Sequence, residues 1–336
     1  MPLVPYLHRV ASGVDLTSAE ARAAMTVLLE GSVNEAQVGG FLIALRMKGE
    51  TATELAGFAR ALRERMVVVD AGANVIDIVG TGGDGAGTFN ISTVAAIVLA
   101  GAGLLVAKHG NRAISGKVGS ADVLEGLGVR IAMTPEEASR AVREIGLGFL
   151  FAPHLHPAMK YVQGVRRELK MRTVFNLLGP LANPARAQTQ VIGAPSPELA
   201  GIMAEALSEL GTSHSFVVHG NDGLDEISTS SSTEVYEVWT ARVEKHVWKP
   251  EDFGVARASL ETLAGGDGLE NAKITLEILR GTKNAKRDIV LVNAAAGLLA
   301  AGLAEEPRAA MLKAAESVDS GRALRVLEKL REKFAN

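Results

Sequence analysis

The spacing of apolar positions changes near residue 70 of the chain. Before that point apolar residues recur every three or four positions over Ser18–Glu30, Asn34–Lys48 and Thr51–Arg65. This spacing is typical of amphipathic helices, and few strand-forming residues interrupt it. The pattern therefore predicts an all-helical N-terminal domain over residues 1–70.

After residue 70, short apolar runs alternate with helical segments. Met159–Leu169 is expected to be helical, residues 234–248 alternate like a short antiparallel hairpin, and the chain is mainly helical from Leu269 onward. Alternating strands and helices favour a mostly parallel sheet covered by helices, so residues 71–336 are expected to form a larger α/β domain. The predicted strands are Val75–Val79, Leu104–Ala107, Val129–Ala132, Phe149–Ala152, Thr173–Asn176, Gln190–Ala194 and Ser215–His219.

Composition narrows the class of protein. The chain has 336 residues, 35 Lys and Arg against 38 Asp and Glu, and a formal charge of −3, so it offers no overall basic field for nucleic acid or an anionic membrane. It has no cysteine, which excludes disulfides and cysteine nucleophiles. The most apolar run, Val94–Ala107, is too short to span a bilayer, and the N-terminus lacks the pattern of a secretory signal. We therefore expect a cytoplasmic protein with no nucleic-acid or membrane partner.

Residues 80–93, with the sequence GTGGDGAGTFNIST, are the most informative stretch. Five glycines lie between a predicted strand and an apolar helix that is expected to open near Asn90. Glycines let backbone N–H groups approach a phosphate closely, and the N-terminus of a helix favours negative charge. The stretch predicts a phosphate-binding loop, although it matches neither the dinucleotide fingerprint nor a Walker loop well.

Two further polar loops follow predicted strands. Residues 108–122 contain lysines, an arginine, glycines and serines that suit a polyanion, and Ser120 is expected to cap the next helix. In the loop from His219 the adjacent Asp225 and Glu226 suit Mg²⁺, which commonly takes one or two carboxylates together with substrate phosphates. Ligands of open α/β sheets bind beyond the carboxyl ends of the strands, where all three loops are expected.

Taken together and in this order, the motifs resemble those of the anthranilate phosphoribosyltransferase family, which belongs to the nucleoside-phosphorylase-like class of phosphoribosyltransferases. The resemblance covers nearly the whole chain, and ordered agreement over several loops is far more specific than one motif. The matching stretches are GTGGD at 80–84, NIST at 90–93, KHGNR at 108–112, RRE at 166–168, FNLLGPLANP at 175–184 and HGNDGLDE at 219–226.

The resemblance implies a homodimeric, Mg²⁺-dependent enzyme of tryptophan biosynthesis. Such an enzyme transfers the phosphoribosyl group of phosphoribosyl diphosphate to the amino group of anthranilate, giving N-(5′-phosphoribosyl)anthranilate and diphosphate. It also implies that helices at about residues 155–185 return to the small helical domain. The substrates are small molecules, and the protein chiefly positions them and stabilises the departing charge.

The resemblance also assigns site residues. Phosphoribosyl diphosphate is expected to contact Gly80, Gly83, Asp84, Thr88, Asn90, Ile91, Ser92, Thr93, Lys108, His109, Gly110, Asn111, Arg112, Ser115 and Ser120. Anthranilate is expected to contact Gly80, His109, Asn111, Pro153, His156 and Arg166. The expected metal ligands are Ser92, Asp225 and Glu226. No residue is assigned as an acid or base, and Lys108, Asn111 and Arg166 are expected to position the transition state.

Some points depart from the family or leave alternatives open. Gly116 stands where many relatives carry a serine, and Lys170 replaces a glycine that ends a helix. His109 is interpreted as steering anthranilate in preference to acting as a general base. A pyrimidine nucleoside phosphorylase would share the fold, but its Lys-x-Ser-Thr-Gly-Gly loop is absent. A non-catalytic relative that binds nucleic acid is the second alternative, and the net charge disfavours it.

Overall fold

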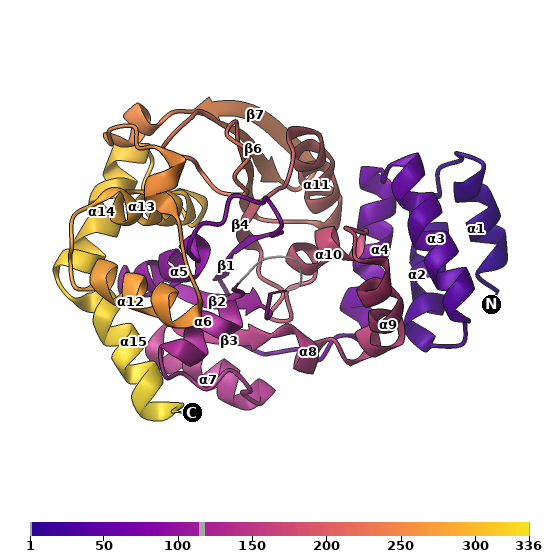
Figure 1. The fold of residues 1–336 in the computed structure, drawn as a ribbon, viewed down its shortest axis with the longest axis horizontal. Helices are drawn as coiled ribbons and strands as arrows, with labels where there is room; N and C mark the ends of the chain where they lie inside the picture. Colours follow the sequence, from indigo (N-terminus) through magenta and orange to yellow (C-terminus); the bar gives the residue numbers. More distant parts are fainter. Residues whose placement is uncertain (1, 114–117, 336) are drawn as a thin grey trace.

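A computed structural model describes residues 2–113 and 118–335 of the chain. A smaller helical lobe stands beside a larger α/β lobe, and the N-terminus lies at the outer end of the helical lobe (Figure 1). Capping boxes start α2 at Thr17 and Glu20, and α4 at Thr51 and Glu54. The N-terminal helices are α1 Val4–Ala11, α2 Ser18–Glu30, α3 Glu35–Lys48 and α4 Ala52–Arg65.

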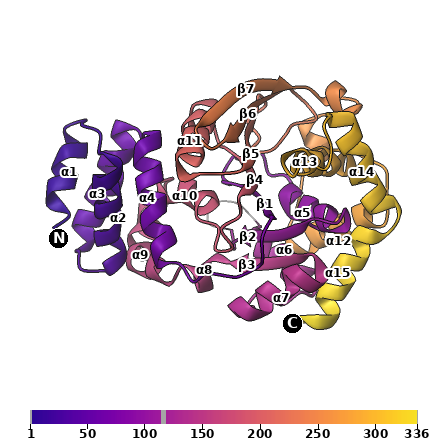
Figure 2. The same ribbon diagram turned by 180° about the vertical axis from the view of Figure 1, so that it is seen from behind.

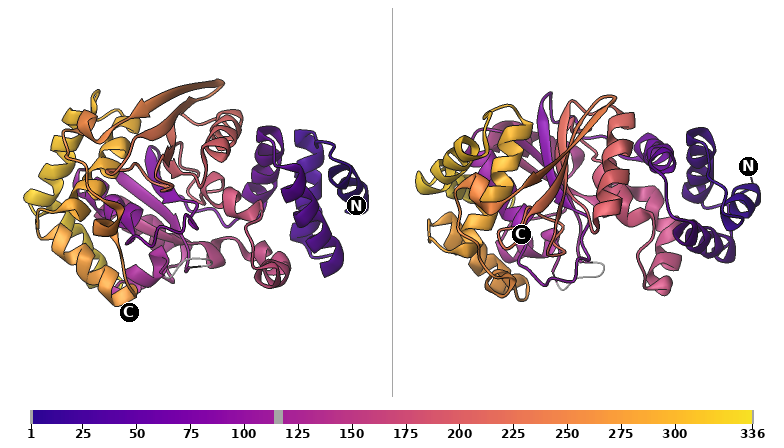
Figure 3. Two further views of the ribbon diagram at one scale, coloured as in Figure 1. Left: turned by 45° about the horizontal axis from the view of Figure 1, so that its top comes forward. Right: turned by 90° about the horizontal axis from the view of Figure 1, so that it is seen from above.

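Two later helices lie against this N-terminal group. Helix α9, Lys160–Leu169, packs beside α2 and α3, and helix α10, Phe175–Leu181, packs beside α4. Buried side chains from this group, including Phe41, Phe58 and Leu178, form one continuous apolar core. The chain therefore crosses between the two lobes more than once, as the views from behind and from above also show (Figures 2 and 3).

The α/β lobe is built on a seven-stranded sheet in the order β3-β2-β1-β4-β5-β6-β7. The first five strands in sequence run parallel, and β6 and β7 form an antiparallel hairpin, so the predicted hairpin is confirmed. The strands are β1 Val75–Gly80, β2 Leu105–Gly110, β3 Leu147–Phe151, β4 Thr189–Gly193, β5 His214–Gly220, β6 Thr233–Trp239 and β7 Arg242–Trp248. The carboxyl ends of the parallel strands lie along one edge.

Helices cover both faces of this sheet. Helix α5, Ile91–Gly101, is almost wholly buried and packs against β1, α13 and α15, whereas α11, Pro197–Leu210, fills the space between β5, β6 and α4. The remaining helices are α6 Ser120–Gly126, α7 Pro135–Ile145, α8 Ala152–Leu155, α12 Gly268–Leu279, α13 Ala285–Ala300, α14 Pro307–Asp319 and α15 Arg322–Lys333, with 3-10 turns at Pro157–Met159, Pro250–Phe253 and Leu260–Leu263. The predicted fold class, a small helical part and a larger α/β part with a mostly parallel sheet, is confirmed.

Two of the predicted strands are wrong. Val129–Ala132 is a connecting segment that makes one isolated bridge between Val129 and Ala335, because its apolar side chains face the core of the lobe and not a neighbouring strand. Thr173–Asn176 leads into α10, and the Asn176 side chain accepts a hydrogen bond from the backbone N–H of Thr173. Short apolar runs fit a strand or a buried loop equally well, so tertiary packing decides between them.

Candidate active site

The glycine-rich loop leaves the carboxyl end of β1 and reaches α5. Gly82, Gly83, Gly85 and Gly87 have φ values of 72°, 75°, 76° and 67°, which residues other than glycine rarely adopt. The loop is attached at its start, where the backbone N–H of Thr81 donates to Gly193 O at 3.0 Å. Its curvature therefore depends on glycine at four positions.

Asp225 and Glu226 face this loop from the segment after β5. The Asp225 carboxylate accepts a hydrogen bond from Gly82 N at 2.6 Å, and the Glu226 carboxylate accepts one from Ser92 N at 3.2 Å. A side chain at Gly80 or Gly193 would clash, because an added Cβ would lie 2.5 Å from Asp225 Oδ2 or 1.6 Å from Asp225 O. Glycines at the ends of β1 and β4 thus make room for the acidic pair.

The acidic pair holds its protons unusually strongly. Burial raises the pKa of Asp225 to about 7, and the neighbouring Asp84 carboxylate contributes to the rise. Burial and the charge of Asp225 also raise the pKa of Glu226 well above its usual value, while Lys108 opposes this shift. Two close carboxylates in a region of low polarity resist carrying two negative charges without a cation.

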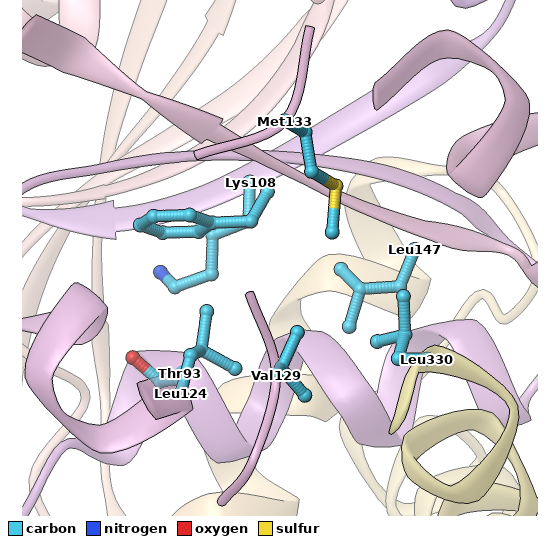
Figure 4. A pocket seen from close by; sticks show the side chains of 8 residues that line it. Thr93, Lys108, Leu124, Val129, Met133, Leu147 and Leu330 are labelled. Atoms are coloured by element: carbon cyan, nitrogen blue, oxygen red, sulfur yellow. The ribbon is translucent and has the colours of Figure 1, made fainter. Parts of the chain in front are cut away.

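Lys108 supplies a positive charge from β2. Its Nζ donates to Ile78 O at 2.7 Å and lies 3.4 Å from Ser92 Oγ, and burial lowers its pKa. With Thr93 it borders a small cavity whose other lining residues, among them Met133 and Leu147, are apolar (Figure 4). The ammonium group is therefore fixed close to the acidic pair, in surroundings that strengthen its electrostatic attraction.

His109 follows Lys108 and is also buried. Its Nδ1 lies 3.1 Å from Gly179 O, and its ring centroid is 5.0 Å from that of His156. Burial, and then the neighbouring His156, lower the pKa of His109 to about 3, and burial lowers the pKa of His156 to about 4. Both rings are neutral near pH 7, and a pKa of about 3 makes His109 a weak base.

Arg166 lies on α9 and faces the start of α10. Its guanidinium lies 5.1 Å from the centroid of the Phe175 ring, and burial lowers its pKa. Within residues 2–113 and 118–335 no carboxylate or carbonyl pairs with this guanidinium. A half-buried guanidinium of this kind is suited to binding a carboxylate from a ligand.

The chain is similar to known proteins over nearly its whole length. The glycosyl transferase family helical bundle domain matches residues 4–66, and the glycosyl transferase family a/b domain matches residues 72–324. An anthranilate phosphoribosyltransferase from Solibacter usitatus is 54% identical over 96% of this chain and 96% of its own length. One from Symbiobacterium thermophilum is 52% identical over 97% of this chain and 96% of its own length.

Solved structures agree with these relatives. The anthranilate phosphoribosyltransferase of Thermus thermophilus superposes with a TM-score of 0.92 at 43% identity, covering 97% of this chain and 98% of its own. The chain belongs to the anthranilate phosphoribosyltransferase family. The Saccharomyces cerevisiae enzyme, solved in complex with phosphoribosyl diphosphate and Mg, has a TM-score of 0.90 at 32% identity, covering 98% of this chain and 97% of its own.

Membership in this family confirms the predicted phosphoribosyl transfer to anthranilate and favours it over both alternatives. None of the helices in the described part of the chain is long and apolar enough to cross a membrane. The assignment of individual residues to phosphoribosyl diphosphate or anthranilate stays a prediction.

The described residues on either side of the second loop are held by contacts with one another. Arg112 forms ion pairs with Asp122 and Glu125, and the Asn111 side chain accepts from Arg112 N at 2.7 Å. Ser120 is the first residue of α6, but it does not cap the helix as predicted. Gly119 precedes the helix instead, and its N–H donates to Asp122 at 2.8 Å. The predicted Ser115 contact and the Gly116 departure lie outside the described residues.

The remaining predicted residues are placed as follows. Asn90 precedes α5, donates to Val118 O at 3.1 Å and accepts from Asn271 at 3.0 Å, so its amide links the glycine loop to both neighbours. Thr88 bridges to Ala264, and Pro153 is exposed at the start of α8. Ile91 is buried as the first residue of α5. Gly110 lies against the side chain of Ser120.

Sequence reasoning missed several residues that hold the site in place. Arg172 donates to Gly82 O and Gly83 O at 2.9 Å each. Asp77, whose pKa burial raises to about 6, accepts from Asn183 at 2.7 Å and from His109 N at 3.2 Å. An aspartate inside the apolar run of β1 was the one visible signal, because carboxylates are rarely buried without partners.

A second group of potential metal ligands lies away from these loops, on the β6–β7 hairpin. Glu237, Glu244 and His246 offer ligand atoms within 4.8 Å of one another. His246 lies 3.0 Å from Glu237, and His214 lies 2.7 Å from it. These pairs link neighbouring strands, so a cross-strand polar network explains why the three side chains lie close together.

Proposed function

We propose that the loops at the carboxyl edge of the sheet transfer the phosphoribosyl group from phosphoribosyl diphosphate to anthranilate. The anthranilate nitrogen forms a bond to the anomeric carbon, the bond from that carbon to the diphosphate oxygen breaks, and the amine proton is lost to solvent. The products are N-(5′-phosphoribosyl)anthranilate and diphosphate. The observation that carries the proposal is the contact of Asp225 with Gly82 N and of Glu226 with Ser92 N, which brings an acidic pair onto a phosphate-binding loop.

The diphosphate is proposed to lie on the glycine loop and the start of α5. Several backbone N–H groups here, those of Gly83 and Asp84 among them, have no acceptor within the described chain. Free N–H groups and a helix N-terminus attract an anion. Lys108 adds a fixed positive charge nearby.

Mg²⁺ is proposed to bind at Asp225, Glu226 and Ser92. The raised pKa values of the two carboxyl groups favour a cation beside them, and oxygen ligands of this kind suit Mg²⁺. The ion would offset the negative charge that the departing diphosphate gains. Asp225 and Glu226 would hold it through their carboxylate groups, and Ser92 through its hydroxyl.

Anthranilate is proposed to bind between the lobes. The guanidinium of Arg166, which has no acceptor among residues 2–113 and 118–335, would hold its carboxylate. The rings of His109 and His156 would form a neutral wall. Asn111, Gly80 and Pro153 complete the predicted set. An arylamine is already neutral near pH 7, so the buried His109, with a pKa of about 3, has no need to act as a base.

The test follows the loss of anthranilate fluorescence with purified protein, phosphoribosyl diphosphate and Mg²⁺. Asp225→Asn is expected to lower kcat/KM by at least about 100-fold, because it removes a carboxylate of the proposed metal site. Arg166→Ala is expected to lower kcat/KM by about 10- to 150-fold, because a charge-assisted contact contributes about 1.5–3 kcal/mol. Arg166→Ala should raise KM for anthranilate and leave that for phosphoribosyl diphosphate unchanged.

The matched control is Arg167→Ala, since Arg167 is the exposed neighbour of Arg166 on α9. It should retain wild-type rates. Metal-independent turnover, or full activity of Asp225→Asn, would contradict the assigned site. Turnover of a pyrimidine nucleoside with inorganic phosphate would instead indicate a pyrimidine nucleoside phosphorylase.

We further propose a homodimer in the cytoplasm. Several large apolar side chains of the helical lobe are exposed, including Met47 at 83%, Tyr161 at 46% and Val14 at 45%. A second subunit that covered these side chains would remove their apolar surface from water, which favours association. Light scattering coupled to size-exclusion chromatography would measure the mass, and a monomer at micromolar concentration would contradict the proposal.

A further inference from the structure

Arg172 lies between the two lobes and reaches the glycine loop. A single nitrogen of its guanidinium, Nη2, donates to two successive backbone carbonyls, Gly82 O and Gly83 O, at 2.9 Å each. The guanidinium is half-buried, its pKa is lowered by that burial, and the charges of Asp225 and Asp84 oppose the shift. The contact thus joins the segment before α10 to the turn of the loop.

The planar trans peptide turns this contact into a constraint on the N–H groups. The C=O and N–H of one peptide point in opposite directions. Gly82 O shares its peptide with Gly83 N, and Gly83 O shares its peptide with Asp84 N. Because Arg172 holds both carbonyls on its own side, the N–H groups of Gly83 and Asp84 are directed to the opposite side, where neither has a protein acceptor within the described chain.

The neighbouring peptide is fixed by a different residue. Gly82 N donates to Asp225 Oδ2 at 2.6 Å, so consecutive peptides are held by Arg172 and by Asp225. Glycines with positive φ have many alternative conformations, and without such bonds the turn would sample them. The two contacts together select one conformation of the turn.

Arg172 is itself attached to the helical lobe. Arg46, in the last turn of α3, donates from its side chain to the backbone carbonyl of Arg172. A continuous line of hydrogen bonds therefore runs from α3 through Arg172 to the glycine loop and on to Asp225. The conformation of the loop is thereby linked to the position of the helical lobe.

We propose that Arg172 is a positioning residue that presets the N–H groups of Gly83 and Asp84 to receive the diphosphate of phosphoribosyl diphosphate. The inference rests on the proposed function for the identity of the anion. Arg172 acts through the backbone of the loop and touches neither reacting atom. Its substitution should therefore weaken binding of phosphoribosyl diphosphate selectively and leave binding of anthranilate intact.

The test compares Arg172→Met, which keeps the aliphatic part of the side chain, with Arg167→Met on the exposed face of α9. Loss of two hydrogen bonds from a charged donor is expected to raise KM for phosphoribosyl diphosphate by about 10- to 100-fold. KM for anthranilate should change by less than about 2-fold. Equal increases in both KM values, or no increase, would overturn the proposal.

A second measurement does not depend on turnover. Nuclear magnetic resonance relaxation of the Gly82 and Gly83 amides should show lower order parameters in Arg172→Met than in the wild type, without change in Arg167→Met. Arg46→Met should give a smaller increase in KM for phosphoribosyl diphosphate, because the Arg172 side chain remains. Unchanged order parameters would overturn the proposal.

Calorimetric titration of phosphoribosyl diphosphate with Mg²⁺ separates this inference from the proposed function. If the wild type binds the ligand but transfers nothing to anthranilate, the proposed function fails, and the effect of Arg172→Met on binding still decides the inference. If the variant transfers normally and binds normally, the function stands and the inference fails.

Discussion

At the scale of single residues, the lack of a side chain at Gly193 leaves space for Asp225 and Glu226. An added Cβ would lie 1.6 Å from Asp225 O, far inside van der Waals contact. Gly193→Ala must therefore displace the Asp225 backbone. A shift of about 1 Å in a site can cost about 100-fold in rate, so we expect a loss of at least that size in kcat/KM.

Gly40→Ala is the control for this substitution. Gly40 lies in α3, and its added Cβ would meet Leu7 at an ordinary 3.7 Å. Alanine also favours a helix more than glycine does. The control should keep full activity in the anthranilate fluorescence assay, whereas an active Gly193→Ala enzyme would show that the Asp225 backbone can move without harm.

His109 makes stability depend on pH. Its pKa of about 3 in the folded protein lies below the value of about 6.5 in an unfolded chain, so only the unfolded state gains a proton between these limits. The neutral buried ring therefore makes its full contribution to the free energy of unfolding above about pH 6.5, and this contribution is lost as the pH falls toward 3. Between about pH 7 and pH 5 the loss is about 2 kcal/mol.

Urea unfolding of wild type and His109→Gln at both pH values measures this effect. The difference in unfolding free energy between the two proteins should shrink by about 2 kcal/mol at the lower pH. His156, with a folded-state pKa of about 4, is present in both and does not enter the difference. A constant difference across this range would show that His109 titrates normally in the folded state.

At this scale the residues of the proposed site could be named from the sequence, whereas the residues that hold them in place could not. Asp225, Glu226, Lys108 and the glycines are recognisable because few other side chains serve phosphate and Mg²⁺ on loops. Arg172 was missed since an arginine acting on backbone carbonyls leaves no pattern in the sequence, and its partners lie 90 and 89 residues away.

At the scale of elements, α9 ends on an unfavourable residue. Lys170 occupies its C-cap with φ of 48°, in the left-handed region that glycine adopts without strain. Lys170 thus lies at a helix end, as expected. Lys170→Gly is predicted to raise the free energy of unfolding by about 0.5–1 kcal/mol, because relief of the strain exceeds the added chain entropy.

Chemical denaturation of Lys170→Gly would measure that gain. Lys170→Ala serves as the control, because alanine keeps the Cβ that causes the strain and should bring no comparable stabilisation. A destabilised Lys170→Gly protein would show that the aliphatic part of the lysine contributes more than its backbone conformation costs.

Elements with a long and regular pattern were predicted well. The N-terminal helices, the parallel strands and the β6–β7 hairpin follow the spacing of their apolar residues. Val129–Ala132 and Thr173–Asn176 failed because such short runs carry too little periodicity to separate a strand from a buried loop. Their conformation is set by contacts with Ala335 and with the start of α10, which no local pattern records.

At the scale of the molecule, the proposed site draws its residues from both lobes. Arg166 belongs to α9 on the helical side, and Asp225 follows β5 on the α/β side. Closure of the lobes would bring the two substrates together and exclude water.

The order of strands in the sheet could not be predicted from residue patterns, because it depends on pairings between distant segments.

Small-angle scattering should show a smaller radius of gyration with phosphoribosyl diphosphate, Mg²⁺ and an unreactive anthranilate analogue than with none of them. Arg166→Ala, which lacks the contact to the carboxylate, should close less completely at the same concentrations. Identical scattering profiles with and without ligands would show that the lobes are already at their working distance.

The hairpin at the end of the sheet has a consequence for solubility. β7 is an edge strand, and an edge strand with free backbone groups invites pairing with another chain. Arg242, Glu244 and Lys245 place charges of both signs along this strand, and all three already form ion pairs within the hairpin. Extension of the sheet beyond β7 into a second copy would crowd these charges, so they protect this edge of the sheet against edge-to-edge aggregation.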